Sequence, residues 1–116
     1  MDVLRWDEEP VEQLSVGIGR RMLNGEAMTL AQITLGAGAV VPEHAHPNEQ
    51  IATVVSGRVR FVVGGEERVV GPGESVLIPG NVPHRVDVLE ESVVLDAFAP
   101  RREDWIRGDD AYLRGR

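Results

Sequence analysis

Glycine and proline residues interrupt this sequence every few positions, and apolar side chains recur at every second position between the interruptions. Val59, Phe61 and Val63 show this alternation within one short run. A period of two is typical of β-strands, and short strands separated by frequent turns are typical of a sandwich or a barrel. No long segment carries a helical period. The pattern therefore predicts an all-β fold.

Turn residues divide the chain into short expected strands. Turns are indicated at Asn24-Gly25, Ser56-Gly57, Gly64-Gly65 and Gly71-Pro72-Gly73. The Gly-Gly pair suits the positive φ angles of a two-residue hairpin. The predicted strands are residues 27–35, 51–55, 58–63, 66–70, 75–78 and 93–99.

Helical structure is expected only as a turn or two, within residues 7–14 and in the charged tail from Arg101. The length of 116 residues leaves room for one domain, 1–116, with a barrel core over about residues 15–99 and a tail over 101–116. The tail could cap the barrel or pack on a partner subunit. Its possible anchors are Trp105, Ile106, Tyr112 and Leu113.

Composition and charge exclude several classes of protein. Cysteine is absent, which rules out disulfides and thiolate metal sites. The formal charge of -7 argues against nucleic-acid binding, which needs a basic surface. No apolar run resembles a signal peptide or is long enough to span a membrane, so the expected location is the cytoplasm.

The three histidines of the chain are the strongest chemical signal. His44 and His46 are two positions apart, between Pro42 and Pro47, so an extended segment would project both imidazoles from one face. Gln50 follows at the start of the next strand, and His84 comes much later. Neutral imidazoles with one oxygen ligand suit a divalent ion such as Mn, Fe, Co, Ni, Cu or Zn. Spacing alone also allows ordinary surface or core histidines.

Two motifs resemble those of the cupin family. Gly38-x5-His44-x-His46-x3-Gln50-x6-Gly57 is similar to the first cupin motif, and Gly73-x5-Pro79-x-Asn81-x2-His84 is similar to the second. The resemblance implies a small single-domain cupin of the RmlC-like superfamily, with a jelly-roll barrel (a double-stranded β-helix). It also implies one divalent transition metal per chain, held by His44, His46, Gln50 and His84.

Three positions depart from the cupin motifs. Gln50 replaces a glutamate, so the metal site would carry a net positive charge and favour an anionic ligand. Glu49, the other possible ligand, should face away from Gln50 because side chains alternate along a strand. Asn81 replaces a glycine, and asparagine tolerates the left-handed conformation that such a turn can require. Val88 replaces the final asparagine of the second motif, which we interpret as a structural change only.

A second resemblance covers residues 95–105, LDAFAPRREDW. This stretch is similar to small cupins of pectin and alginate breakdown, which convert 4,5-unsaturated monouronates to the linear 5-keto-4-deoxyuronate. The resemblance implies that Asp96, Phe98 and Arg102 line the substrate pocket. Asp96 would transfer protons while water adds to the enol ether and the ring opens, Phe98 would pack on the sugar ring and Arg102 would hold the carboxylate.

The residues themselves leave the position of Asp96 open. Alternation places Asp96 on the same strand face as Val94 and Phe98, where a carboxylate is costly unless it is paired or used. It could therefore face the metal cavity, pair with an arginine at the barrel rim or face solvent. Arg60 has two interpretations as well. Its side chain could lie on a solvated face, or it could enter the barrel and bind a carboxylate through paired hydrogen bonds.

The leading functional hypothesis is thus a metal-dependent enzyme acting on a small anionic acid. The alternatives are a metal-dependent dioxygenase of the quercetinase type and a non-catalytic cupin that only binds a small ligand. An unpaired barrel edge favours a homodimer, because open strands invite pairing. Neither nucleic acid nor a membrane is an expected partner.

Overall fold

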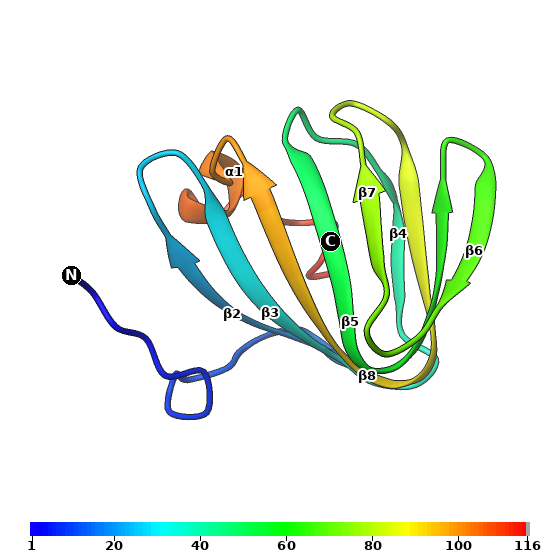
Figure 1. The fold of residues 1–116 in the computed structure, drawn as a ribbon, viewed down its shortest axis with the longest axis horizontal. Coiled ribbons are helices and arrows are strands. Elements are labelled where there is room, and N and C mark those ends of the chain that lie inside the picture. Colours follow the sequence, from blue (N-terminus) through cyan, green and yellow to red (C-terminus); the bar gives the residue numbers. More distant parts are fainter. Residues whose placement is uncertain (116) are drawn as a thin grey trace.

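The computed structural model describes residues 1–115, which form eight strands and one short helix (Figure 1). The strands are β1 (Glu12–Ser15), β2 (Ile18–Asn24), β3 (Thr29–Leu35), β4 (Val40–His44), β5 (Glu49–Val63), β6 (Glu66–Val70), β7 (Ser75–Ile78) and β8 (His84–Ala99). The helix is α1 (Glu103–Ile106). The all-β prediction is confirmed, and β6 and β7 have the predicted bounds.

The two long strands β5 and β8 connect two layers of an antiparallel barrel. The first half of β5 pairs with β7 and with the second half of β8. The second half of β5 pairs with β6 and with the first half of β8. β3, β2 and β1 extend the first layer, whereas β4 extends the second. Both long strands bend between their halves, so the layers face each other across a shared interior (Figure 1).

Residues 51–55 and 58–63 are one strand, β5, and not the two strands that Ser56-Gly57 was expected to separate. The pairing with β8 shifts register between Val54 and Val59. Gly57 has a φ of 90°, and a Cβ there would lie 2.1 Å from the Ser92 hydroxyl oxygen. Glycine therefore lets β5 bend tightly against β8 without ending the strand.

The prediction for the last strand was too short. β8 begins at His84 and not at residue 93, because its first half pairs with both β4 and β5. The sequence carried a sign of this, since Val86 and Val88 alternate with charged residues. In the second half of β8, the expected face is buried, and its members are Ser92, Val94, Asp96 and Phe98.

The N-terminal region differs from the prediction in detail. Residues 6–8 form a single turn, and β1 then occupies the end of the range 7–14 where a helical turn or two could fit. β3 begins at Thr29 and not at residue 27. Asn81 has a φ of 65°, so the left-handed turn inferred for it is confirmed.

The C-terminal tail folds back and caps the barrel, which is one of the two predicted arrangements. Trp105 and Leu113 are buried and Tyr112 is partly buried, as expected for anchors. Ile106 is wrong as an anchor, because 43% of it is exposed. Arg116, the last residue of the predicted tail, lies outside the described residues.

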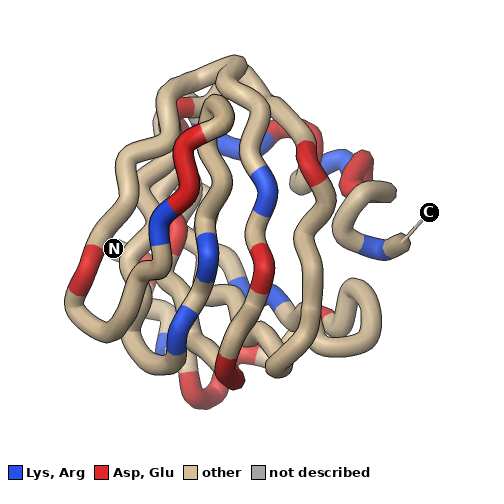
Figure 2. Tube along the Cα trace, turned by 90° about the vertical axis from the view of Figure 1, so that its right-hand side faces the viewer, with Lys and Arg blue, Asp and Glu red and all other residues tan. Residues whose placement is uncertain are grey.

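Charges of both signs are interspersed along the strands on the face seen in Figure 2. Arg60 pairs with Glu67 at 2.7 Å, on the outside of the barrel, so the interpretation in which Arg60 enters the barrel is wrong. Arg85 pairs with Asp87 in the same way. Within residues 1–115, no helix has the length and apolar character required to cross a bilayer.

Candidate metal centre and substrate cavity

The three histidines converge inside the barrel mouth. His44 ends β4 and lies opposite His84, the first residue of β8, while His46 follows in the loop before β5. One ring nitrogen of each imidazole lies within 4.8 Å of the others, so the triad can hold a metal ion. Pairing of β4 with β8 therefore brings together residues that are far apart in the sequence.

Backbone carbonyls determine which nitrogen of each imidazole is free. The Nδ1 atoms of His44, His46 and His84 lie 2.8, 3.0 and 2.9 Å from the carbonyl oxygens of Pro42, Asn48 and Val82. A carbonyl oxygen only accepts, so each Nδ1 must carry the hydrogen. Each Nε2 then has a free lone pair, which is the arrangement of a metal-binding histidine.

Gln50, the second residue of β5, brings an amide oxygen next to the triad. Its Nε2 donates to Asp96 Oδ1 at 3.0 Å, which directs its Oε1 toward His46 Nε2 at 3.1 Å. Both of these atoms are acceptors, and no hydrogen remains to join them. His84 Nε2 is also buried and has no hydrogen-bond partner among residues 1–115. A bound cation would satisfy all three atoms, so these residues fit a metal, while Glu49 is exposed on the opposite face as expected.

Burial keeps the imidazoles neutral. Desolvation lowers the pKa of His44 and of His46 from 6.5 to about 4, and the neighbouring histidines and Arg102 contribute to this shift. Desolvation also lowers the pKa of His84. A neutral imidazole is the form that binds a metal, so the triad is ready for a cation well below neutral pH.

We expect the affinity for Zn²⁺ or Mn²⁺ to stay nearly constant from pH 7 to about pH 5.5, because protons compete for His44 and His46 only near their pKa of about 4 and burial lowers the pKa of His84 as well. Ordinary histidines would lose affinity from about pH 6.5 downward. Calorimetric titration of the metal-free protein measures this, with circular dichroism at each pH as the control for folding. A tenfold loss of affinity between pH 7 and pH 6 would contradict the expectation.

Asp96 faces the metal cavity, one of the three positions left open by the sequence. It is buried on β8 and neither reaches solvent nor pairs with an arginine. Desolvation raises the pKa of Asp96 from 3.8 to about 6, although the hydrogen bond from Gln50 and the charge of Arg102 act in the opposite direction. A carboxyl group with this pKa can accept and release a proton near neutral pH.

Phe98 and Arg102 line the same cavity. The Phe98 ring contacts His46 edge-on, with 5.7 Å between ring centroids. The Arg102 guanidinium carbon lies 4.7 Å from the Phe98 ring centroid and 4.0 Å from the Trp105 ring centroid, and these two rings contact each other edge-on. All three residues that the second resemblance singled out thus lie beside the histidine triad.

Sequence reasoning did not identify Tyr112 as part of this cavity. Its ring stacks on His44 with 4.4 Å between centroids, and the cavity beneath has a volume of about 60 Å³. The sequence pattern offered no signal for this contact, because it depends on how the tail folds back. Trp105, expected only to pack, also lines the cavity.

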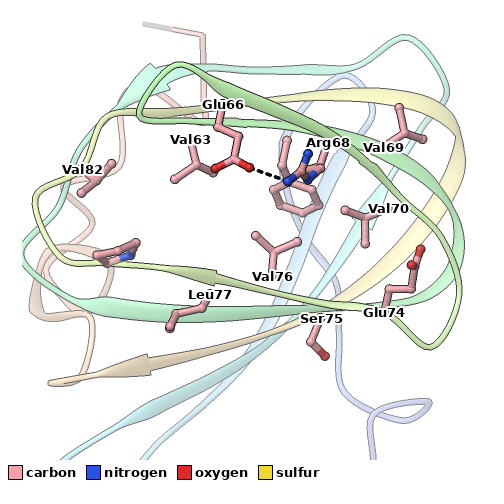
Figure 3. Close-up of a pocket in the computed structure, with 12 residues that line it drawn as sticks. Val63, Glu66, Arg68, Val69, Val70, Glu74, Ser75, Val76, Leu77 and Val82 are labelled. Atoms are coloured by element: carbon pink, nitrogen blue, oxygen red, sulfur yellow. Dashed lines mark ion pairs between the residues drawn. The ribbon is translucent and has the colours of Figure 1, made fainter.

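A second cavity of about 540 Å³ lies between β6 and β7 and contains none of the histidines (Figure 3). Valine is the commonest residue in its walls, and Arg68 and Glu66 form an ion pair there. It is larger than the cavity at the triad, but within residues 1–115 the cluster of side chains that could hold a metal ion is the histidine triad and not a set in this second cavity.

Comparisons with known proteins agree with this geometry. The chain is 34% identical over 103 residues to the pectin degradation protein KdgF of Dickeya dadantii, covering 86% of this chain and 94% of that protein. The structure of KdgF from Halomonas sp. superposes with a TM-score of 0.86 at 29% identity, covering 90% of this chain and 98% of the other. An RmlC-like cupin from Shewanella frigidimarina gives a TM-score of 0.84 at 28% identity, covering 88% and 93%.

The family model described as Cupin domain matches residues 31–98, which include the three histidines, Gln50 and Asp96. That range is more than half of the chain. The convergence of the triad in a two-layered barrel, the superposition on cupin structures and this match lead to one conclusion: the protein belongs to the cupin family.

Proposed function

We propose that this cupin converts 4,5-unsaturated monouronates to the linear 5-keto-4-deoxyuronate, using one divalent transition metal per chain. The similarity to KdgF of Dickeya dadantii, a pectin degradation protein, supports this substrate class. So does the site, in which a metal-binding triad, a proton-transferring carboxylate and an arginine surround one cavity.

The observation that carries the proposal is the chain of contacts around Asp96. Its carboxylate accepts a hydrogen bond from the Gln50 amide, and the oxygen of that amide faces His46. A substrate bound at the triad would therefore lie within reach of a carboxyl group with a pKa of about 6. Glutamine adds no negative charge to the site, which favours an anionic substrate over a neutral one.

The residues of the chain have distinct roles in this reaction. His44, His46, Gln50 and His84 would hold the metal, which acts as a Lewis acid when bound and polarises an oxygen of the substrate. Arg102 would bind the substrate carboxylate, because a guanidinium matches it with paired hydrogen bonds. Phe98 would pack against the sugar ring.

Asp96 would move the protons. Its carboxylate accepts a proton from water as the water oxygen bonds to C5 of the enol ether, and it delivers this proton to C4. The new hydroxyl at C5 then loses its proton as the bond between C5 and the ring oxygen breaks, and the ring oxygen takes up a proton. The products are a ketone at C5 and a hydrated aldehyde at C1, so the only reactants are the uronate and water.

The test is turnover of the products of a pectate or alginate lyase. Metal-loaded protein should accelerate the loss of the absorbance of the unsaturated bond, and NMR should identify the 5-keto product. No acceleration over the blank, with bound metal verified by elemental analysis, would remove the proposal. Oxygen consumption would favour the dioxygenase alternative, and ligand affinity without turnover would favour the non-catalytic binding module.

We also propose that the protein is a homodimer. Among the described residues, β6 and β7 each pair only with β5, and exposed Val69 and Leu77 lie along the cavity between them. Open strand edges with apolar neighbours favour association with a second copy. Sedimentation equilibrium tests this directly. The cytoplasmic location stays a prediction from the sequence.

A further inference from the structure

The C-terminal segment is fastened to the barrel by a cluster of charged side chains. Asp110 is buried, and it accepts hydrogen bonds from Arg20 at 2.9 Å and from Arg114 at 2.6 Å. Both arginines also bond to Glu12 on β1. Buried ion pairs of this kind hold a segment in one place, because separating them would leave buried charges without partners. Residues 103–114, which we call the C-terminal cap, thus have a defined position over the barrel mouth.

Tyr112 is one of three residues of the C-terminal cap that line the metal cavity, together with Trp105 and Leu113. Its hydroxyl oxygen accepts a hydrogen bond from Arg102 Nη2 at 2.9 Å and another from Trp105 Nε1 at 3.1 Å. Its ring stacks on His44. The hydroxyl therefore uses both of its acceptor positions, one within the cap and one that connects the cap to the arginine of the substrate site.

The hydrogen bonds of Arg102 leave one of its nitrogens available. Nε and Nη2 donate to the two carboxylate oxygens of Asp104 at 3.0 and 2.8 Å, and the second hydrogen of Nη2 goes to Tyr112. Among residues 1–115 the two hydrogens of Nη1 have no hydrogen-bond partner, and the Nη1 atom is not fully buried. Since Arg102 lines the cavity, Nη1 is the donor that a bound carboxylate can use.

We propose that Tyr112 is a positioning residue: by accepting from Nη2, it orients the Arg102 guanidinium so that Nη1 is presented to the carboxylate of the substrate. Asp104 alone would hold one edge of the guanidinium, and the contact with Tyr112 prevents rotation about that edge. Tyr112 acts through Arg102 and takes no part in proton transfer. The identity of the substrate rests on the proposed function, whereas the contact between Tyr112 and Arg102 does not.

The variant Tyr112→Phe keeps the ring on His44 and removes only the hydroxyl. We expect KM for the unsaturated monouronate to rise about tenfold with kcat within about twofold, because the loss affects binding of the carboxylate. In an Arg102→Lys background, Tyr112→Phe should have no further effect on KM, since Tyr112 acts through Arg102. Ile106→Ala, an exposed position in the same cap, is the matched control and should leave KM unchanged.

A second measurement does not depend on turnover. NMR relaxation of the Arg102 Nε–H group, assigned by its absence in Arg102→Lys, should show greater mobility in Tyr112→Phe than in the wild type and in Ile106→Ala. If the wild type converts no uronate while this mobility increases, the proposed function fails and the positioning role stands. Unchanged mobility of Arg102, or equal KM effects in both backgrounds, would overturn the role of Tyr112.

Discussion

Replacing His84 with leucine is expected to weaken metal binding by at least about 100-fold and to abolish turnover of the uronate. His84 is 2% exposed and its Nε2 has no hydrogen-bond partner in the part of the chain that the structure describes, so its lone pair is available to a metal ion at the triad. Leucine has a similar volume but no lone pair. Loss of a residue that only supports a metal ligand typically lowers the affinity for the metal 10- to 100-fold, so loss of a ligand itself should lower it further.

Elemental analysis after dialysis and calorimetric titration with Zn²⁺ or Mn²⁺ measure the effect. Arg85→Ala is the matched control, because this neighbour on β8 is exposed and pairs with Asp87 away from the cavity. The chain contains only three histidines, so no other imidazole can replace the lost ligand. Retention of stoichiometric metal at wild-type affinity in His84→Leu, with the fold intact by circular dichroism, would show that the triad is not the metal site.

The variant Asp96→Asn is expected to lower kcat by about 10²- to 10⁴-fold, the usual contribution of a positioned acid or base. Asparagine can still accept the hydrogen bond from Gln50 Nε2, so the metal should stay bound. The change removes the proton-transferring group and little else. Asp87→Asn on the same strand is the control, because Asp87 pairs with Arg85 outside the cavity.

The pH dependence of the wild type provides an independent check on Asp96. The carboxylate is the form that accepts a proton from water, so kcat should rise with pH and level off above its pKa of about 6. An Asp96→Asn variant with near wild-type kcat, or a wild-type rate that falls as pH rises from 5 to 7, would refute this role.

Local sequence signals predicted the parts of the fold that depend on neighbouring residues. β6 and β7 have their predicted bounds because glycine turns enclose them. β5 and β8 were predicted as shorter strands, because residues such as glycine occur both at a bend inside a strand and in a turn between two strands. Only pairing with β8 shows that Gly57 is a bend, because β5 pairs with β8 on both sides of it, with a shift of register in between.

The sequence by itself determined which side chains share a face: alternation places Asp96 with Val94 and Phe98, and extended backbone around His44 projects its imidazole with that of His46. It left open whether Asp96 faces the interior, and the role of Gln50 as a ligand came from the resemblance to the cupin motif. The tertiary structure decided which of these groups meet. Gln50 reaches Asp96 because β5 pairs with β8, and Tyr112 reaches Arg102 because the C-terminal cap folds back over the barrel. Periodicity reports the direction of a side chain along its own strand, whereas contacts between distant segments depend on register and closure of the whole barrel.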